Sequence, residues 1–313
     1  MINKSTKIFL AGHNGMVGSA IYRNLLKKNY KNIFTIEKKK IDLRDQQKVF
    51  KYLKKIKPDA VILAAAKVGG IQANNTFRGE FIYDNLSIQN NVIHGSYIND
   101  VKNLIFLGSS CVYPKNSKQP IKEDYLLSNY LEKTNEPYAI SKIAGINLCQ
   151  SYRDQYQLNY KSLMPCNAYG INDNYNLKTS HFFPALIRKV LEAKNNNKKH
   201  IELWGIAGTL REMMFADDIA DACIFFLNKK TTAPFINIGS GHEDTIENYA
   251  KTIMKHVGVK LKIKYKKNKL KGTHKKLLDN SLAKRLGWSA KTTINEGLEI
   301  TIKDYLSRFD EKK

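Results

Sequence analysis

The stretch KIFLAGHNGMVGSAI (7–21) begins as an apolar run and continues into three glycines spaced three residues apart. A run of this kind that ends in glycines and opens a helix is typical of the first strand, turn and helix of a dinucleotide-binding fold. The glycines let the backbone turn tightly and approach a pyrophosphate, whose charge then lies at the helix N-terminus. The residues predicted to form this phosphate cradle are Gly12, Gly15, Met16, Val17 and Gly18.

The end of the second expected strand, TIEKKK (35–40), bears on which dinucleotide is bound. A carboxylate at this point, here Glu37, holds the ribose 2′-OH of NAD, whereas a cation holds the 2′-phosphate of NADP. Three lysines follow Glu37, so we favour NADP(H), with Lys38 as the first candidate contact. A solvated turn is the alternative interpretation of these lysines.

Apolar bursts and amphipathic stretches alternate through the first 165 residues. Short apolar strands between longer amphipathic helices indicate a parallel sheet with right-handed crossovers. The fold class is therefore predicted as α/β, a Rossmann-type doubly wound parallel sheet. The expected strands are 7–12, 32–36, 60–66, 103–109 and 160–165, and the expected helices are 16–28, 45–56, 81–100 and 138–156.

After residue 165 this rhythm loosens, which indicates a second, smaller α/β lobe. The expected elements there are helices at 181–194 and 217–228 and strands at 201–205 and 234–241. We expect the last of these strands to join the first sheet. The predicted domains are therefore residues 1–165, an NADP-binding domain with return segments near 211–241, and residues 166–313, a C-terminal lobe that binds substrate.

NEPYAISK (135–142) places Tyr138 and Lys142 four residues apart, on one face of an expected helix. A free phenol has a pKa of about 10, and we expect the Lys142 ammonium to lower the pKa of Tyr138 by favouring phenolate. Tyrosine can then exchange a proton with a carbonyl or alcohol oxygen while hydride moves at carbon. Ser109 ends the fourth expected strand, where ligands bind to open parallel sheets, so its hydroxyl is predicted to hold a substrate oxygen beside Tyr138.

The chain carries a formal net charge of +24, from 52 Lys and Arg against 28 Asp and Glu. Only eight of these cations are arginine, whereas base recognition favours arginine with interleaved aromatic residues. We therefore expect no nucleic-acid partner and interpret the basic runs 194–199 and 264–276 as surface loops. Some of the lysines are expected to attract an anionic substrate.

No apolar run approaches the roughly 18–20 residues that a membrane helix needs, and the start MINKSTKIFLAG lacks a signal-peptide pattern. We therefore expect no membrane association and a cytoplasmic location. The four cysteines form no CxxC motif, so neither a disulfide framework nor a metal site is predicted. Cys149, Cys166 and Cys223 fall in helical or strand patterns and are interpreted as packing residues.

The glycine motif, a serine at the end of the fourth strand and the YxxxK spacing together resemble the extended short-chain dehydrogenase/reductases. Longer blocks resemble the GDP-L-fucose synthase family, whose members are 3,5-epimerase/4-reductases of GDP-4-keto-6-deoxymannose. The resemblance runs from residue 7 to about residue 290. Its blocks include AGHNGMVGSAI, LAAAKVGGI, FIYDNL, LGSSCVYP, NEPYAISKIAGI, SHFFPALIRK and KKLLD.

This resemblance implies NADP(H) as cofactor, a GDP-linked keto-deoxysugar as substrate, and a homodimer formed through the helices at 81–100 and 138–156. It also implies that Cys111 and His181 are the base and acid of epimerisation. Such chemistry is reasonable because a 4-keto group acidifies the protons on C3 and C5, and cations favour the reactive thiolate of cysteine. Tyr138 would then protonate the C4 oxygen during reduction.

The resemblance further assigns binding residues. At the cofactor it implies Asn14, Lys38, Tyr138, Lys142, Pro165, Asn167 and His181. At the substrate it implies Ser109, Asn167, Lys189, Trp204, Arg211 and Lys271. Asn14 and Lys38 stand where the family usually has arginine, which weakens the case for NADP without reversing it.

Several residues of the expected pocket wall also depart from the family pattern, among them Cys166, Ala168 and Phe215. A reductase of a related GDP-deoxysugar or heptose that no longer epimerises is therefore an alternative. A 4,6-dehydratase is disfavoured, because those relatives carry an acidic pair where Ser110 and Cys111 stand. A module that binds the dinucleotide without doing chemistry is a further alternative, disfavoured by the intact Ser109, Tyr138 and Lys142.

Overall fold

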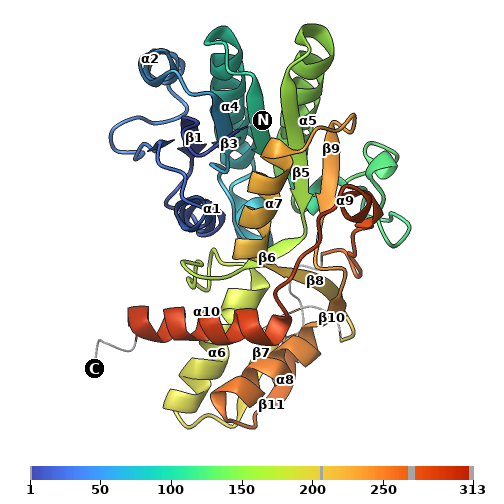
Figure 1. Cartoon of the computed structure of the whole chain (residues 1–313). Helices are drawn as coiled ribbons and strands as arrows, with labels where there is room; N and C mark the ends of the chain where they lie inside the picture. Colours follow the sequence, from blue (N-terminus) through green and yellow to red (C-terminus); the bar gives the residue numbers. More distant parts are fainter. Residues whose placement is uncertain (1, 205–206, 267–271, 310–313) are drawn as a thin grey trace.

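The computed structural model describes residues 2–204, 207–266 and 272–309. Over these ranges the upper lobe in Figure 1 is built on a six-stranded parallel sheet in the order β2-β1-β3-β4-β5-β9. The strands are β1 (Ile8–Ala11), β2 (Ile33–Phe34), β3 (Ala60–Leu63), β4 (Asn103–Leu107), β5 (Asn159–Pro165) and β9 (Phe235–Ile238). The chain steps from β1 to β2 in one direction and from β1 to β3 in the other, which confirms the predicted doubly wound α/β fold.

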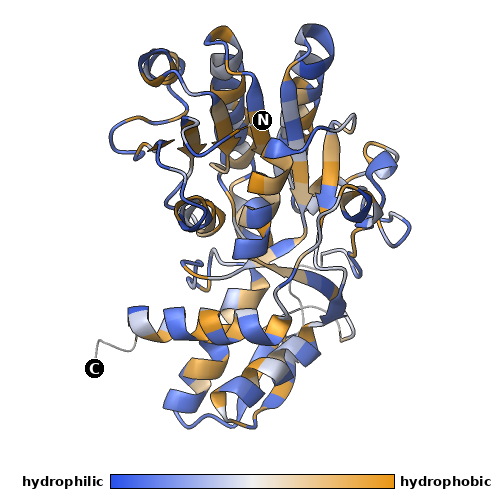
Figure 2. Ribbon diagram, viewed as in Figure 1, coloured by the Kyte–Doolittle hydropathy of each residue, from blue (hydrophilic) through white to orange (hydrophobic). Residues whose placement is uncertain are grey.

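Helices cover both faces of this sheet. One face carries α1 and α7, which pack on each other, and the other carries α2, α4 and α5, which pack side by side. These helices, with the short α3 that precedes α4, are α1 (Met16–Lys27), α2 (Gln46–Ile56), α3 (Ile71–Thr76), α4 (Arg78–Ile98), α5 (Glu136–Tyr156) and α7 (Ala216–Asn228). The central strands β1 and β3 are continuous apolar runs because both faces of the sheet are buried. The helices in Figure 2, in contrast, have a hydrophobic side and a hydrophilic side.

The lower lobe has its own core and two small sheets. One sheet has the order β10-β8-β6 and the other pairs β11 with β7. Its elements are β6 (Asn167–Tyr169), α6 (Phe182–Asn195), β7 (His200–Trp204), β8 (Leu210–Phe215), β10 (Glu243–Thr245), α8 (Ile246–Val257), β11 (Lys262–Lys266) and α10 (Ile294–Phe309). Aromatic and aliphatic side chains of α6, α8 and α10 form a second hydrophobic cluster, separate from that of the upper lobe.

The chain crosses between the lobes more than once. The predicted strand at 234–241 is β9, and it joins the first sheet beside β5. Of the predicted return region near 211–241, α7 and β9 belong to the upper lobe, whereas β8 lies in the three-stranded sheet. The short helix α9 (Ser281–Arg285) then packs against β9, so the C-terminal part of the chain contributes to both lobes.

The expectation that residues 264–276 form a surface loop is wrong at the N-terminal end, where the exposed chain is a strand. Lys262–Lys266 is strand β11, whose parallel pairing with β7 outweighs the low strand propensity of lysine. At the other end, Lys276 is half-buried because the flanking backbone is hydrogen-bonded to other segments. The run of charges therefore identified exposed chain at Lys264–Lys266 but not the strand that this chain forms.

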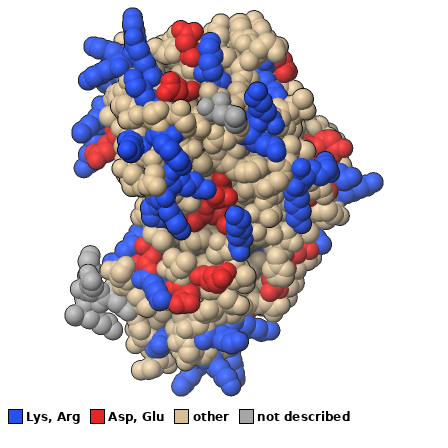
Figure 3. Space-filling view, viewed as in Figure 1, with Lys and Arg blue, Asp and Glu red and all other residues tan. Residues whose placement is uncertain are grey.

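On the face shown in Figure 3, the surface cations are dispersed rather than gathered. Figure 3 shows lysine and arginine side chains over the whole visible face, with acidic side chains between them. Among the residues that the structure describes, no helix is long and apolar enough to cross a membrane.

Candidate active site

The glycine loop has the backbone geometry of a phosphate cradle. Gly12 has a φ of +97°, and a Cβ there would lie 2.5 Å from the amide nitrogen of Ala65. A Cβ on Gly18 would overlap the carbonyl oxygen of Gly12, so both positions require glycine. Gly15 differs, because its nearest contact is the Gly12 oxygen at 3.6 Å and the space beyond is open.

The N-terminus of α1 is available to an anion. Gly15 is its N-cap residue and offers no side chain to the first-turn N–H groups, and the first turn holds no acidic residue. Backbone donors with open space at Gly15 are what a pyrophosphate requires. The Nδ1 atom of His13 is buried in this loop without a hydrogen-bond partner. The residues present therefore fit a dinucleotide.

The other candidate cofactor residues lie around this loop and at the sheet edge. Asn14 is exposed, and its carbonyl accepts a hydrogen bond from the Asn172 side chain at 2.9 Å. Lys38 is exposed beyond β2 and interacts electrostatically with Asp42. Pro165 ends β5, where it pairs with Ile238 of β9. Met16 and Val17 begin α1 and are half-buried.

Ser109, Cys111 and Tyr138 come together at the carboxyl edge of the sheet. Ser109 follows β4 and caps the short helix η1 (Ser110–Val112), with its Oγ accepting from the Cys111 N–H at 3.2 Å. Ser109 also lies within hydrogen-bonding range of the Tyr138 hydroxyl, and Cys111 interacts electrostatically with Tyr138. Cys111 is half-buried, whereas the other three cysteines are buried, as their packing interpretation predicts.

Lys142 lies one turn beyond Tyr138 on α5. Its Nζ donates to the carbonyl of Leu107 at 2.7 Å and lies 5.9 Å from the centroid of the Tyr138 ring. Desolvation lowers the pKa of Lys142 to about 7. The two side chains share one face of the helix, as the spacing predicts.

The expectation that Lys142 lowers the pKa of Tyr138 is wrong for this structure. The pKa of Tyr138 is raised, first by burial and then by the neighbouring Cys111, and only the hydrogen bond with Ser109 opposes these effects. Burial wins because a phenolate loses more hydration than a neutral phenol. Tyr138 is therefore held as a neutral phenol, which is the form that donates a proton.

His181 reaches the same edge of the sheet from the lower lobe. It is the N-cap residue of α6, and the preceding Thr179 accepts a hydrogen bond from the Gly70 N–H at 2.9 Å. The two segments approach so closely at Gly70 that a Cβ there would overlap the Ser180 carbonyl, so this position requires glycine. His181 keeps solvent access, yet surrounding protein atoms desolvate it and lower the pKa of its imidazole.

Arg211 and Asn167 lie on neighbouring strands of the three-stranded sheet. Arg211, on β8, donates to the carbonyl of His274 at 3.3 Å and interacts electrostatically with Cys111. Desolvation lowers the pKa of its guanidinium. The Asn167 side chain, on β6, donates to the backbone carbonyl of Glu212 at 3.1 Å.

Lys189 and Trp204 contact each other where α6 meets β7. The Lys189 Nζ lies 5.3 Å from the centroid of the Trp204 ring and donates to the carbonyl of Glu202 at 2.8 Å. Desolvation lowers the pKa of Lys189. The remaining candidate substrate contact, Lys271, lies outside the described residues.

Lys276 is a site residue that sequence reasoning missed. Its Nζ lies 3.9 Å from the Cys111 Sγ, across 165 positions of sequence. The only available signal was the block KKLLD, since the surrounding lysines gave the segment the character of a surface loop. A single cation in a lysine-rich run cannot be singled out from composition.

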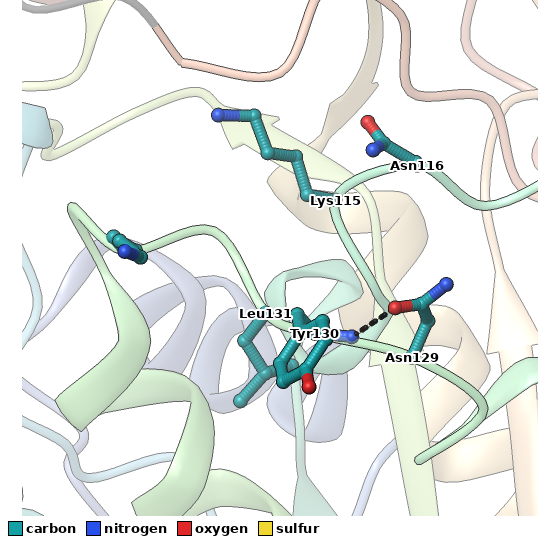
Figure 4. Close-up of a pocket in the computed structure, with 6 residues that line it drawn as sticks. Lys115, Asn116, Asn129, Tyr130 and Leu131 are labelled. Atoms are coloured by element: carbon teal, nitrogen blue, oxygen red, sulfur yellow. Dashed lines mark hydrogen bonds between the residues drawn. The ribbon is translucent and has the colours of Figure 1, made fainter.

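Two cavities lie elsewhere on the molecule. Figure 4 shows one of about 350 Å³, lined by Lys115, Asn116, Asn129, Tyr130, Leu131 and Lys133, with the Tyr130 N–H donating to the Asn129 side chain at 2.7 Å. The other, of about 520 Å³, lies near Asp221 and Trp288, between the ends of α1 and α7. Neither cavity is lined by Ser109, Cys111 or Tyr138.

Comparisons with known proteins agree with this geometry. The model of the NAD dependent epimerase/dehydratase family matches residues 8–239. A protein of Arabidopsis thaliana named putative GDP-L-fucose synthase 2 is 48% identical over 313 residues, covering 100% of this chain and 95% of its own length. The GDP-L-fucose synthase of Escherichia coli is 43% identical, with 97% of this chain and 98% of its own covered.

A solved structure is similar over nearly the whole fold. The GDP-mannoheptose C4 reductase from Campylobacter jejuni, with NADP bound, has a TM-score of 0.88 at 34% identity, covering 97% of this chain and 99% of its own. A match of this extent spans both lobes. The chain therefore belongs to the NAD dependent epimerase/dehydratase family, together with the GDP-L-fucose synthases that resemble it along their full length.

Proposed function

We propose that this chain converts GDP-4-keto-6-deoxy-D-mannose to GDP-L-fucose, by epimerising C3 and C5 and then reducing C4 with NADPH. The observation that carries the proposal is the grouping of a thiol, a hydroxyl and a neutral phenol, those of Cys111, Ser109 and Tyr138, at one sheet edge. The full-length similarity to two GDP-L-fucose synthases supports the same substrate.

In the epimerisation, the Cys111 thiolate is the base. It takes the proton from C3 or C5, and the electron pair of the C–H bond moves into an enolate on the C4 oxygen. His181 returns a proton on the opposite face of the ring, which inverts that centre. Because burial lowers the pKa of His181, its imidazolium, once formed, is a stronger acid than an ordinary histidine and gives up its proton readily.

In the reduction, Tyr138 is the acid. When bound, NADPH supplies the hydride that adds to C4. The Tyr138 phenol protonates the C4 oxygen as its negative charge develops, and Ser109 holds that oxygen by a hydrogen bond. Lys142 would hold the cofactor ribose and the tyrosine together. Its ammonium has three N–H donors, one of which bonds to the Leu107 carbonyl.

The cradle around Gly15 would hold the pyrophosphate of the nicotinamide cofactor, and Lys38 and Asn14 its 2′-phosphate. We favour NADP(H) because three lysines follow Glu37 and because the similar reductase binds NADP. Arg211 and Lys189 would neutralise the diphosphate of GDP, arginine through paired hydrogen bonds and lysine as a point charge.

The experiment that tests this proposal is incubation of the purified chain with GDP-4-keto-6-deoxy-D-mannose and NADPH. The expected product is GDP-L-fucose, recognised by NMR from the configurations at C3, C4 and C5. A product reduced at C4 but with C3 and C5 unchanged would reject the epimerase half. Absence of NADPH oxidation would reject the whole proposal.

A second candidate is a GDP-keto-sugar C4 reductase that does not epimerise. The similarity to the GDP-mannoheptose C4 reductase and the altered pocket wall at Cys166, Ala168 and Phe215 favour it. Incubation of the keto-sugar with enzyme in deuterated water, without NADPH, separates the two candidates. Deuterium at C3 and C5 is expected for the epimerase, and unlabelled sugar for the plain reductase.

We further propose that the upper lobe binds the cofactor, that the lower lobe binds the sugar nucleotide, and that the protein is a cytoplasmic homodimer. The dimer is placed on α4 and α5, which pack on each other and expose Tyr83, Ile98, Ile140 and Tyr156. Light scattering should give twice the chain mass, and Ile140→Asp should shift it to one chain.

A further inference from the structure

Three segments place charged or titratable groups within electrostatic reach of Cys111. Tyr138 comes from α5, Arg211 from β8 and Lys276 from the segment that precedes α9. Of these three side chains, Lys276 contacts the sulfur itself. Its Nζ lies 3.9 Å from the Cys111 Sγ. At this distance an ammonium group favours the charged form of the sulfur, the thiolate.

The backbone directly after Lys276 is hydrogen-bonded to three other parts of the fold. The Leu277 N–H donates to the Gln119 side chain at 2.8 Å, and the Leu277 carbonyl accepts from the Ile121 N–H at 2.8 Å. The Leu278 N–H donates to Glu212 at 3.0 Å. These bonds fix where the Lys276 backbone lies relative to the sheet edge, and from there its ammonium reaches Cys111.

Glu212 is an unusual anchor for this segment. Its carboxylate is 0% exposed and accepts from the N–H groups of Gly241 at 2.7 Å and Leu278 at 3.0 Å. A Cβ on Gly239 would overlap this carboxylate, so the strand end at β9 is shaped around it. One buried side chain thus joins the end of β9, the strand that carries Arg211, and the segment that carries Lys276.

We infer that Lys276 is a further residue of the epimerisation site, whose ammonium pairs with the Cys111 thiolate and is positioned by Glu212. The inference rests on the proposed function, because it gives the thiolate the role of carbon base. Lys276 itself gains and loses no proton in the step. Cys111 takes the proton from carbon, and the ammonium stabilises the sulfur anion before the transfer.

Alkylation of Cys111 by iodoacetamide tests the pairing without any sugar. The other three cysteines are buried, so Cys111 is the expected site of modification, and Cys111→Ala provides the blank. At about pH 7.5, Lys276→Met should slow alkylation at least about fivefold, while Lys276→Arg should restore most of the rate. At about pH 10, where an ordinary thiol is ionised, the wild type and Lys276→Met should react alike.

Lys275→Met is the matched control. Lys275 is the neighbouring lysine on the same segment, and its ammonium is paired with Glu243 at 2.6 Å. It should leave the alkylation rate unchanged at both pH values. Glu212→Gln should lower the rate at about pH 7.5 in the same direction as Lys276→Met, because a carboxamide cannot accept both N–H bonds as a carboxylate does.

Equal alkylation of wild type and Lys276→Met at about pH 7.5 would overturn the inference, as would an equal slowing at both pH values, which would indicate altered access. Deuterium exchange at C3 and C5 of the keto-sugar then separates the two proposals. If alkylation responds to Lys276 but the wild type exchanges no deuterium, the proposed function fails and the pairing stands. If the wild type exchanges and Lys276→Met exchanges equally fast, the inference fails and the function stands.

Discussion

At the residue scale, the state of Tyr138 separates the two half-reactions. Burial and the neighbouring Cys111 keep its phenol neutral, so removing the hydroxyl should affect reduction alone. We expect Tyr138→Phe to lower kcat for NADPH oxidation by about 10²–10⁴-fold, with deuterium exchange at C3 and C5 retained. NADPH absorbance and NMR measure the two. Loss of both by the same factor would contradict separate roles.

Cys111 should give the opposite pattern. Its side chain is half-buried and can take a proton from carbon, which alanine cannot do. We expect Cys111→Ala to lower the exchange at C3 and C5 by about 10²-fold or more, because one positioned proton acceptor is lost. Slow NADPH oxidation should persist, giving a sugar reduced at C4 without inversion. Retained exchange, measured by NMR in deuterated water, would show that another group is the base.

The residues that could be named from the sequence share one property: each belongs to a motif with a fixed spacing. Tyr138 and Lys142 are one helical turn apart, and Ser109 and Cys111 follow a buried strand. Lys276 and Glu212 could not be found in this way, because their contacts join segments far apart in the chain. The direction of the Tyr138 pKa was also missed, since the sequence shows a nearby lysine but not the burial.

At the element scale, the turn from β1 into α1 depends on Gly18. A Cβ at this position would overlap the Gly12 carbonyl and displace the loop from the helix. We expect Gly18→Ala to weaken NADPH binding by at least about tenfold, equivalent to about 1.4 kcal/mol. Fluorescence titration measures the affinity. Gly79→Ala on α4, where a Cβ meets nothing within 4 Å, is the control and should bind as the wild type does.

Strand β5 carries an unusual buried cation. Lys161 is 0% exposed, its Nζ donates to the Phe226 carbonyl at 3.0 Å, and desolvation lowers its pKa to about 8. Between this value and the ordinary lysine pKa of about 10.4, the unfolded chain binds more protons than the folded one. Stability therefore rises with pH across this window. The cost of burying the charge is fully present below about pH 8.

Lys161→Met removes that charge and should show the reverse trend. The free energy of unfolding of the variant minus that of the wild type should be about 2 kcal/mol larger at about pH 7 than at about pH 9.5. The unpaired Phe226 carbonyl lowers both values equally, so it cancels from the comparison. Urea denaturation at the two pH values measures the difference. A variant-minus-wild-type difference independent of pH would contradict the assigned protonation of Lys161.

At the scale of the whole molecule, the upper lobe followed from the sequence and the lower lobe did so only in part. Each strand from β1 to β5 is a local apolar run, and the crossover rule then fixes their parallel arrangement. The lower lobe is assembled from segments interleaved with β9, such as β8 with β6 and β11 with β7. Pairing between such distant segments leaves no periodic signal in any one window.

The net charge of +24 belongs to this same scale, because the cations are dispersed over the face that Figure 3 shows. A dispersed positive field accelerates the encounter with an anionic sugar nucleotide and is screened by salt. Raising ionic strength from about 20 mM to about 300 mM shortens the range of this field several-fold. We therefore expect kcat/KM for the GDP-sugar to fall several-fold while kcat stays constant.

Steady-state kinetics with NADPH held saturating at each salt concentration measure this effect, and a matched concentration of sucrose controls for osmotic changes. An unchanged kcat/KM would mean that the local cations of the site, Arg211 and Lys189, account for substrate capture and that the remaining lysines serve only solubility. A fall in kcat itself would point instead to ion pairs within the active site. Because the acidic side chains interspersed in Figure 3 weaken any single patch, retention on DNA at physiological salt is not expected.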